Sequence, residues 1–305
     1  MRYMFVCIAL LLAACVHQNG QPVTQVGDKL TEIKARGTLI IATDPDYAPQ
    51  SQLLKDMSPA LGTKCEPTQY TANQFIGFDV AVAVAVANQL GVEPCFVTPP
   101  WSQLVAGNWG DNWDIHAGSM AITLDRMNSL YFSQPYYAPP IVALVHKENT
   151  TYQKPEDLSG KRIGVCVGCT FEEYLKGTLK LPGDGVKYRI RDAQIIGYEN
   201  EDPAIRDLLL GDGAKLDAVL TLLPIANQAI ASGQSVKILG EPLFFAYASI
   251  TVDRSSQRDL TSLMKEIDLA IKDLHQSGIL KQMSENYHKQ DLTQEAARFD
   301  LSSIN

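Results

Sequence analysis

Short apolar runs alternate with helix-like segments along most of the chain, and this alternation limits the fold more than any other feature. Runs rich in β-branched residues, such as 38–42 and 141–146, are typical of buried strands. Segments with helical spacing lie between such runs, and the clearest extends from Leu260 to Leu274. Strands that alternate with helices build sheets with largely parallel strands. We therefore expect an α/β fold.

The same strand–turn–helix theme occurs on both sides of residue 140, which predicts two similar lobes. We expect the chain to cross between them near 133–140 and to return near 240–247. Two extended crossings favour a hinge. The predicted boundaries are residues 37–137 plus 247–288 for lobe I, and residues 138–246 for lobe II.

One segment, Val80–Ala87, fits two kinds of element. Its strict Val-Ala alternation has the period of a strand. However, alanine favours helix, and Gly91 follows the segment where a helix commonly ends. On those two signals we predict a helix.

The first fifteen residues resemble an export signal. Arg2 supplies a positive charge, and Met4–Ala14 then carries no charge over eleven residues. A bilayer-spanning helix needs about 20 residues, so this run suits the apolar core of a signal peptide instead. The small residues before Cys15 resemble the lipobox of bacterial lipoproteins, in which the cysteine thiol carries lipid. The alternative is an ordinary secretory signal with a chance cysteine.

These signals predict where the protein resides. We expect a signal peptide at 1–14 and a lipidated tether at 15–36, with Cys15 as the lipidation site. The protein would then be exported and anchored to a membrane, facing the periplasm or the cell exterior. At the other end, the polar residues 289–305 are predicted to form a loose tail.

Four cysteines remain beyond the leader, and an even number in an exported protein suggests two disulfides. Three pairings are possible, and of these we favour Cys65–Cys95 and Cys166–Cys169. A C-x-x-C pair is also compatible with redox activity or metal binding. No second C-x-x-C or H-x3-H stands nearby to complete a zinc site, so we expect neither a metal nor a cofactor.

The overall charge excludes some partners. The chain has 26 Lys and Arg against 34 Asp and Glu, a formal net charge of −8. A nucleic-acid partner would require a basic face, so we expect none. The mean hydropathy of −0.06 excludes a protein with many membrane spans.

Several segments together resemble the extracellular solute-binding proteins that serve amino-acid importers. Their order and spacing carry the resemblance, which extends from about Gly37 to Tyr287. It implies a two-lobed, periplasmic-binding-protein-like fold (type II), with two parallel or mixed sheets flanked by helices, a two-strand hinge and a ligand cleft between the lobes. The matching segments are 41–49, 77–80, 118–126, 132–137, 157–165 and 216–219.

The resemblance also implies ligand-binding residues in lobe I. Arg126 matches the arginine of a T-x-x-R motif that holds the ligand's α-carboxylate in the family, and a guanidinium offers a planar fork of donors for two oxygens. The alternative is a surface arginine. Tyr47 and Trp101 match positions that place side chains against the ligand, although Trp101 would also suit core packing. Gly118 and Ser119 would supply backbone and hydroxyl groups.

Further positions are implied at the cleft. Asp44 matches a position that meets a cationic ligand side chain in some relatives; the alternative is an aspartate that caps a turn. Cys169 stands where relatives have Ser or Thr. Thr170 keeps a hydroxyl and is the predicted N-cap of a helix, whose free N–H groups would favour an anion.

Two positions depart from the family pattern. Leu222 stands where relatives carry the aspartate that binds the ligand's ammonium group, and Ala121 stands where they often have Ser or Thr. An unpaired buried ammonium costs several kcal/mol. Either another acid supplies the charge, namely Asp44, or Glu172 after a rearrangement, or the ligand carries a carboxylate without an α-amine.

We therefore predict a monomeric binding protein, not an enzyme, that delivers a small carboxylate-bearing solute to a membrane permease. One alternative is an enzyme on the same fold, because some relatives are periplasmic dehydratases of cyclohexadienyl carboxylates. Such chemistry needs a cleft acid with a raised pKa, for which Glu172 and Glu173 are positioned. Another alternative is an accessory protein that senses a ligand.

Overall fold

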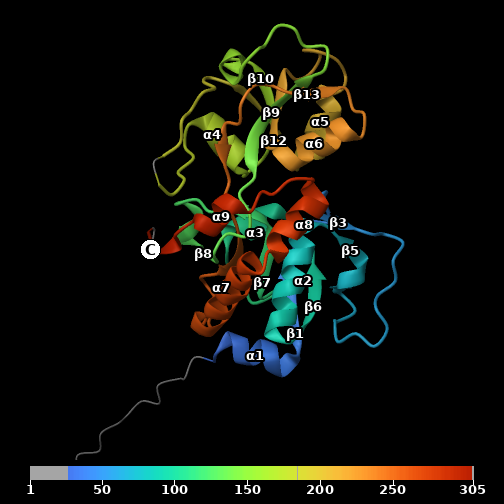
Figure 1. The fold of residues 1–305 in the computed structure, drawn as a ribbon, viewed down its shortest axis with the longest axis vertical. Coiled ribbons are helices and arrows are strands. Elements are labelled where there is room, and N and C mark those ends of the chain that lie inside the picture. The colour runs from blue at the N-terminus through green and yellow to red at the C-terminus, as the bar shows by residue number, and fades with distance from the viewer. Residues whose placement is uncertain (1–26, 184, 304–305) are drawn as a thin grey trace, which may run out of the picture.

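The computed structural model describes residues 27–183 and 185–303. The predicted signal peptide, Cys15 and most of the predicted tether lie outside the described residues. Within the described ranges, no helix has the length and apolar character to cross a bilayer. In Figure 1 the described chain forms an upper and a lower part, each with its own sheet.

Lobe I contains a six-stranded sheet with the order β4-β6-β1-β7-β15-β8. Its central strands β6, β1 and β7 are parallel, whereas β4, β15 and β8 add antiparallel edges. A smaller sheet has the order β2-β3-β5. The strands are β1 (Thr38–Ala42), β2 (Asp46–Tyr47), β3 (Ser51–Leu53), β4 (Tyr70–Thr71), β5 (Phe75–Ile76), β6 (Glu93–Val97), β7 (Ile115–Ala121), β8 (Leu130–Phe132) and β15 (Ala248–Asp253).

Helices surround this sheet in the lower part of Figure 1. The longest, α7, has the amphipathic spacing that the sequence predicted and buries Leu263, Ile267 and Ile271. The α-helices of lobe I are α1 (Lys29–Arg36), α2 (Phe78–Leu90), α3 (Trp101–Ala106), α7 (Thr261–Gln276), α8 (Ile279–His288) and α9 (Gln294–Arg298). The 3₁₀ turns are η1 (Ala72–Gln74), η2 (Arg126–Asn128) and η4 (Leu301–Ser303).

Lobe II forms around a second sheet with the order β11-β10-β12-β9-β13, and β14 also pairs with β9. Strands β11, β10 and β12 are parallel, so their carboxyl ends meet at one edge of the sheet. The elements are β9 (Pro140–His146), η3 (Pro155–Leu158), β10 (Arg162–Cys166), α4 (Thr170–Lys176), β11 (Gln194–Tyr198), α5 (Glu201–Leu208), β12 (Ala218–Leu222), α6 (Leu223–Ala231), β13 (Val236–Ile238) and β14 (Phe244–Phe245). The two mixed sheets flanked by helices confirm the expected α/β class.

The two chain segments that join the lobes lie side by side. The backbone N–H of Ala248 donates to the carbonyl of Tyr137 at 3.0 Å, and that of Tyr136 donates to the carbonyl of Ala248 at 2.9 Å. Ala246 likewise donates to Pro139 at 3.1 Å. The connection between the lobes is therefore a two-stranded ribbon.

The helix prediction for Val80–Ala87 is confirmed, because the segment lies within α2. Gly77 precedes the helix, and Gly91 ends it in the left-handed conformation with φ 74°. The helix packs against the sheet and against α7 and α8, so most of its valines and alanines are buried. Apolar burial over much of its circumference explains why the sequence shows no clean helical stripe.

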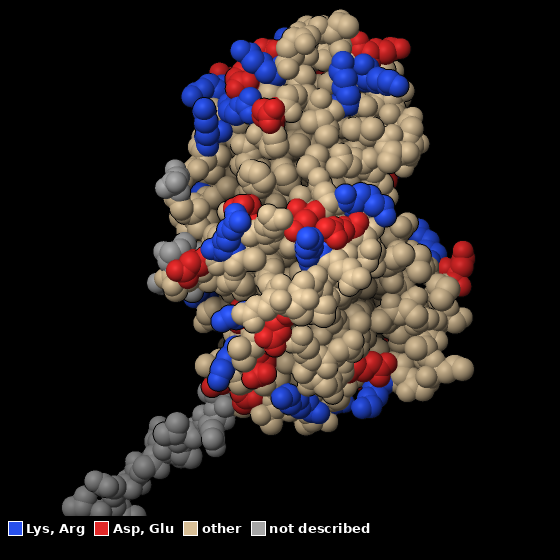
Figure 2. Space-filling model, in the orientation of Figure 1, with Lys and Arg blue, Asp and Glu red and all other residues tan. Residues whose placement is uncertain are grey.

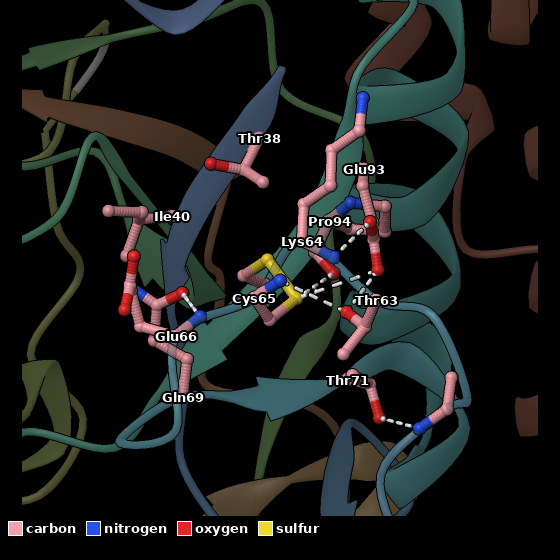
Figure 3. The surroundings of a disulfide bond; sticks show 12 residues. Thr38, Ile40, Thr63, Lys64, Cys65, Glu66, Gln69, Thr71, Glu93 and Pro94 are labelled. Atoms are coloured by element: carbon pink, nitrogen blue, oxygen red, sulfur yellow. Dashed lines mark hydrogen bonds between the residues drawn. A yellow bond between two sulfur atoms is a disulfide. The ribbon is translucent and has the colours of Figure 1, made fainter. Parts of the chain in front are cut away.

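Both favoured disulfides are confirmed, since Cys65 pairs with Cys95 and Cys166 with Cys169. The first attaches the long excursion 51–73 to β6 (Figure 3). Beside it, the backbone N–H of Lys64 donates to Glu93 Oε2 at 2.9 Å, and the Thr63 hydroxyl also bonds to Glu93. An excursion without long strands is therefore held in place covalently.

Two boundary predictions are wrong. The described end of the tether is not a linker, because Lys29–Arg36 forms helix α1, which buries Leu30 and Ile33. The tail is not loose as far as Ser303. The Gln134 side chain donates to the carbonyls of Ala296 at 2.9 Å and Phe299 at 2.8 Å, and the Phe299 ring packs on Tyr247 with ring centroids 4.5 Å apart. Polarity alone indicated a loose tail, but a few apolar side chains are enough to dock it.

Candidate ligand-binding site

A cavity lies between the two lobes, with about 610 Å³ of space that is partly open to solvent. All ten residues predicted to bind a ligand line it: Asp44, Tyr47, Trp101, Gly118, Ser119, Ala121, Arg126, Cys169, Thr170 and Leu222. The prediction missed seven further lining residues: His116, Cys166, Phe171, Glu199, Asn200, Glu201 and Ala246.

Arg126 is a buried cation without a carboxylate partner among the described residues. It is 6% exposed and begins the turn η2 after β7. Its Nη1 donates to the carbonyl of Ala121 at 3.2 Å, and its Nη2 donates to the carbonyl of Gly168 at 3.0 Å. Burial lowers the pKa of the guanidinium, which nevertheless remains charged near neutral pH. A ligand carboxylate would compensate this charge.

Aromatic side chains complete the surroundings of Arg126. The guanidinium carbon lies 5.4 Å from the centre of the Trp101 ring, and Trp101 meets His116 edge-on. The buried Nε1 of Trp101 has no hydrogen-bond partner in the described structure and is available to an acceptor on a ligand. Burial, with a smaller contribution from Arg126, lowers the pKa of His116 to about 3, so the imidazole is neutral. A Cβ at Gly118 would lie 2.6 Å from His116 Nε2, which explains the glycine.

Ser119 lines the cavity, but its polar groups form hydrogen bonds with other residues of lobe I. Its Oγ donates to Asp79 Oδ2 at 2.7 Å and also bonds to the Tyr137 phenol. Its backbone N–H donates to the Tyr136 phenol oxygen at 3.0 Å. These groups are already bonded within lobe I in this structure, so a direct hydrogen bond between the Ser119 hydroxyl and a ligand stays a prediction.

Asp79 is the centre of that network. It accepts from Ser119 and, at 2.8 Å, from the Tyr136 phenol, and it is fully buried near the start of α2. Burial raises the pKa of Asp79 to about 7, against the opposing effect of the two hydrogen bonds. Tyr136 and Tyr137 belong to the crossing segment, so this network joins the floor of the cavity to the connection between the lobes.

On the lobe II side, the Cys166–Cys169 disulfide forms part of the cavity wall. Cys169 is the N-cap of α4, so the prediction that Thr170 caps the helix is wrong by one position. Thr170, a residue that is 4% exposed, lines the cavity, and its hydroxyl makes no hydrogen bond in the described structure. Gly168, between the cysteines, adopts φ +74°, and its N–H donates to Glu172 Oε2 at 2.8 Å.

Glu201 was missed by the sequence analysis and is the most buried acid of the cavity wall, at 4% exposure. The Tyr47 phenol in lobe I donates to its Oε1 at 3.3 Å. Burial, supported by nearby Asp44, raises the pKa of Glu201 to about 7. Burial also raises the pKa of Asp44, which caps the turn at Asp46 through a 2.7 Å bond from the backbone N–H. The spacing of residues in the sequence did not indicate that Glu201 would be buried.

The two departures from the expected pattern make apolar wall. Leu222 ends β12 and is 4% exposed, and Ala121 ends β7 and is 3% exposed. Glu172, one suggested substitute for the missing acid, is instead engaged by Lys176 at 2.6 Å and by the Gly168 N–H. It does not line the cavity in this structure, so it could meet a ligand only after a rearrangement.

Taken together, the wall carries one cation, Arg126, and three acids, Asp44, Glu199 and Glu201. The arrangement can bind a small carboxylate at Arg126 against an indole ring, and it places negative charge elsewhere around the ligand. On the face of the molecule in Figure 2, charged side chains of both signs also gather where the lobes meet.

Comparisons with known proteins agree with this geometry. The family model described as "Bacterial extracellular solute-binding proteins, family 3" matches residues 39–290. The L-cystine-binding protein TcyJ of Escherichia coli (strain K12) is 26% identical over 266 residues, which cover 87% of this chain and 87% of TcyJ. The probable amino-acid-binding protein YxeM of Bacillus subtilis (strain 168) is 25% identical over 231 residues, 75% of this chain and 82% of YxeM.

Solved structures share the fold. The ancestral amino acid-binding protein AncCDT-1, described as a precursor of cyclohexadienyl dehydratase, superposes with a TM-score of 0.67 at 25% identity, over 85% of this chain and 99% of that chain. An ancestral arginine-binding protein bound to arginine superposes with a TM-score of 0.64 at 24% identity, over 82% and 98% of the two chains.

Proposed function

Because the chain belongs to the bacterial extracellular solute-binding proteins of family 3, we propose that it captures an amino acid or a similar carboxylate between its two lobes. In this role it delivers the solute to a membrane importer. Relatives named as binding proteins for cystine and for amino acids support this assignment. The ten residues that we propose as ligand contacts are those predicted above, with Ser119 acting through its place in the wall.

The observation that carries the proposal is the state of Arg126. A guanidinium that is 6% exposed and has only carbonyl partners has lost much of its hydration without gaining a counter-ion. A buried charge of this kind is costly unless it is paired. A ligand carboxylate would supply the pairing, with two oxygens for the planar fork of donors.

The proposal extends to the protein's setting. We propose that Cys15 carries lipid, that the mature protein is a monomer held at the outer face of a membrane, and that its closed form docks on a permease. The two lobes, with the predicted boundaries, would close on the ligand by bending at the two-stranded ribbon that connects them. The protein would bind and release its solute without chemical change.

The alternative is a dehydratase-like enzyme, and one observation favours it. Burial raises the pKa of Glu173, and the positive charge of Arg126 across the lobe boundary opposes this increase only in part. A carboxyl with a raised pKa is suited to donate a proton. Glu173 does not line the cavity, whereas Glu201, whose pKa burial raises to about 7, does. Binding is the assignment that the named relatives support best.

The test is a thermal-shift panel on the purified protein with the twenty L-amino acids, L-cystine, amine-free carboxylates and prephenate, followed by calorimetry on the hits. Ligand at 100 times its Kd adds about 2.7 kcal/mol of stability, which is several degrees in Tm. We expect a shift with at least one carboxylate, and its loss in Arg126→Met but not in Arg206→Gln, an exposed arginine on α5. A panel without any shift, or an unchanged shift in Arg126→Met, would contradict the proposal. Turnover of prephenate would favour the enzyme.

A further inference from the structure

The charges around the cavity are unbalanced in a way that a carboxylate alone does not correct. Among the described lining residues, Arg126 is the one permanent cation, whereas Asp44, Glu199 and Glu201 are acids and His116 is neutral. A ligand carboxylate would neutralise Arg126 and leave the acids without a counter-charge. A second, positively charged group on the ligand would balance these acids.

The three acids differ in how much a ligand cation would stabilise their charged form. Glu199 is exposed, so water already solvates it, and Asp44 is half-buried and accepts a backbone N–H. Glu201 is 4% exposed, and no lysine, arginine or histidine of the described chain forms an ion pair with it. A desolvated acid gains most from a cation, because the interaction is weakly screened.

The sheet topology brings Glu201 to the required place. Strands β11 and β12 flank β10 and run parallel to it, so residues just after Tyr198, Cys166 and Leu222 meet at one edge of the sheet. Glu201 follows β11 by three residues, on one side of the Cys166 turn, and apolar Leu222 lies on the other side. An acid after β11 and a side chain at the end of β12 thus both line the cavity.

We propose that Glu201 binds the ammonium group of the ligand, so that the site selects carboxylates that also carry an amine. This inference rests on the proposed function and narrows it to a substrate class. The ligand would lie with its carboxylate on Arg126 in lobe I and its ammonium on Glu201 in lobe II. The Tyr47 phenol, which donates to Glu201 across the cleft, would hold the carboxylate in position for the ammonium.

The groups that face Glu201 support a proton-linked step. They are Tyr47 on β2, Asp44 before it, Asp202 on its own helix and the oxidised Cys166 on β10, whose Sγ lies 3.8 Å from Oε1. None is a cation. Burial, with smaller contributions from Asp44 and Asp202, raises the pKa of Glu201 to about 7, although the hydrogen bond from Tyr47 acts in the opposite direction. An arriving ammonium would lower that pKa, so binding near pH 6.5 should release a proton.

The experiment is calorimetry with the strongest-binding L-amino acid of the panel and with its 2-hydroxy analogue, in which hydroxyl replaces the amine. The wild type should bind the amino acid at least about 10-fold more tightly. Glu201→Gln keeps the size and the bond from Tyr47 but removes the charge. It should weaken amino-acid binding by about 10- to 100-fold and change analogue binding by less than about 3-fold. Asp273→Asn, at an exposed position of α7 that does not line the cavity, is the control and should bind like the wild type.

The outcomes separate this inference from the proposed function. If no carboxylate binds, both fail. If the analogue binds as tightly as the amino acid, or if Glu201→Gln keeps the preference for the amine, the inference alone fails. Should Glu201→Gln not fold, the wild type decides the matter: calorimetry at pH 6.5 in phosphate and in Tris should report proton release with the amino acid and none with the analogue. Absence of release with the amino acid would overturn the inference.

Discussion

Arg126 Nη2 donates to the carbonyl oxygen of Gly168 at 3.0 Å, and this hydrogen bond joins the two lobes inside the cavity. The other terminal nitrogen donates to Ala121 within lobe I at 3.2 Å. One planar group thus contacts both walls of the site. Two further contacts join the lobes at the rim of the cleft. Lys180 forms an exposed ion pair with Asp125, and the Leu124 N–H donates to the Lys180 carbonyl.

We expect Arg126→Lys to weaken binding of the panel's best carboxylate by about 10- to 100-fold. Lysine keeps the positive charge but lacks the fork that serves two directions at once. Calorimetry measures the loss, and Arg206→Lys on the surface of α5 should leave the affinity unchanged. An Arg126→Lys variant with wild-type affinity would mean that charge alone, not the geometry of the fork, determines binding.

The two disulfides should differ in their effect on stability. Cys65–Cys95 closes a separation of 30 residues, and Cys166–Cys169 closes a separation of 3. The chain-entropy relation gives roughly 3–4 kcal/mol for the longer loop and about 2 kcal/mol for the shorter. Urea unfolding of the Cys65→Ser/Cys95→Ser and Cys166→Ser/Cys169→Ser proteins should show that order. The reverse order would contradict an entropic origin.

The effects of the same two variants on ligand affinity should have the opposite order. The Cys166–Cys169 bridge lines the cavity and encloses Gly168, which accepts from Arg126, so its removal should change the Kd by several-fold or more. The Cys65–Cys95 bridge lies on β6 away from the cavity wall, so its removal should leave the Kd within about 2-fold. Equal effects of the two variants on Kd would show that the bridge in the wall is only structural.

Asp79 should make the ligand-free protein less stable as the pH rises. Burial raises its pKa from 3.8 to about 7, so the folded state retains a proton that the unfolded state loses above about pH 4. Its contribution is complete below pH 4 and is lost as the pH rises through 7, with a slope of up to about 1.4 kcal/mol per pH unit. Glu201 acts in the same direction and over the same window.

The measurement is urea unfolding from pH 4.5 to 7.5. Asp79→Asn should flatten the pH profile relative to the wild type, because asparagine does not titrate, whereas Asp273→Asn, at an exposed position of α7, should run parallel to the wild type. Parallel profiles for Asp79→Asn and the wild type would show that Asp79 has an ordinary pKa.

Phe299 should contribute to the stability of lobe I, contrary to the expectation of a loose tail. Its ring packs on Tyr247, and its carbonyl accepts from the Gln134 side chain. We expect Phe299→Ala to cost about 1–2 kcal/mol in urea unfolding, because the side chain is half-buried. Arg298→Ala, at an exposed neighbouring position, should cost less than about 0.5 kcal/mol. Equal, small effects would mean that the tail is dispensable.

Elements with strong local signals were predictable. The strand at 38–42 has the predicted bounds, and α2 forms where two glycines bracket an apolar run. The resemblance identified ten residues that line one cavity, and several of them lie at the ends of strands or in the turns that follow them. The tail was not predictable in this way, since docking through Phe299 depends on a residue, Tyr247, that lies 52 positions earlier in the chain.

Sequence by itself determined the class of fold and the family, because periodicity, caps and motif order are properties of neighbouring residues. It left three disulfide pairings possible, and the tertiary structure shows the pairs that we favoured. Only the tertiary structure decided which groups carry the unusual electrostatics. Glu201 is enclosed with Tyr47, which lies 154 residues before it, and Asp79 is enclosed with Ser119 and Tyr136. Burial sets the pKa of each carboxyl, and burial arises when distant segments pack together, so no local pattern reveals it.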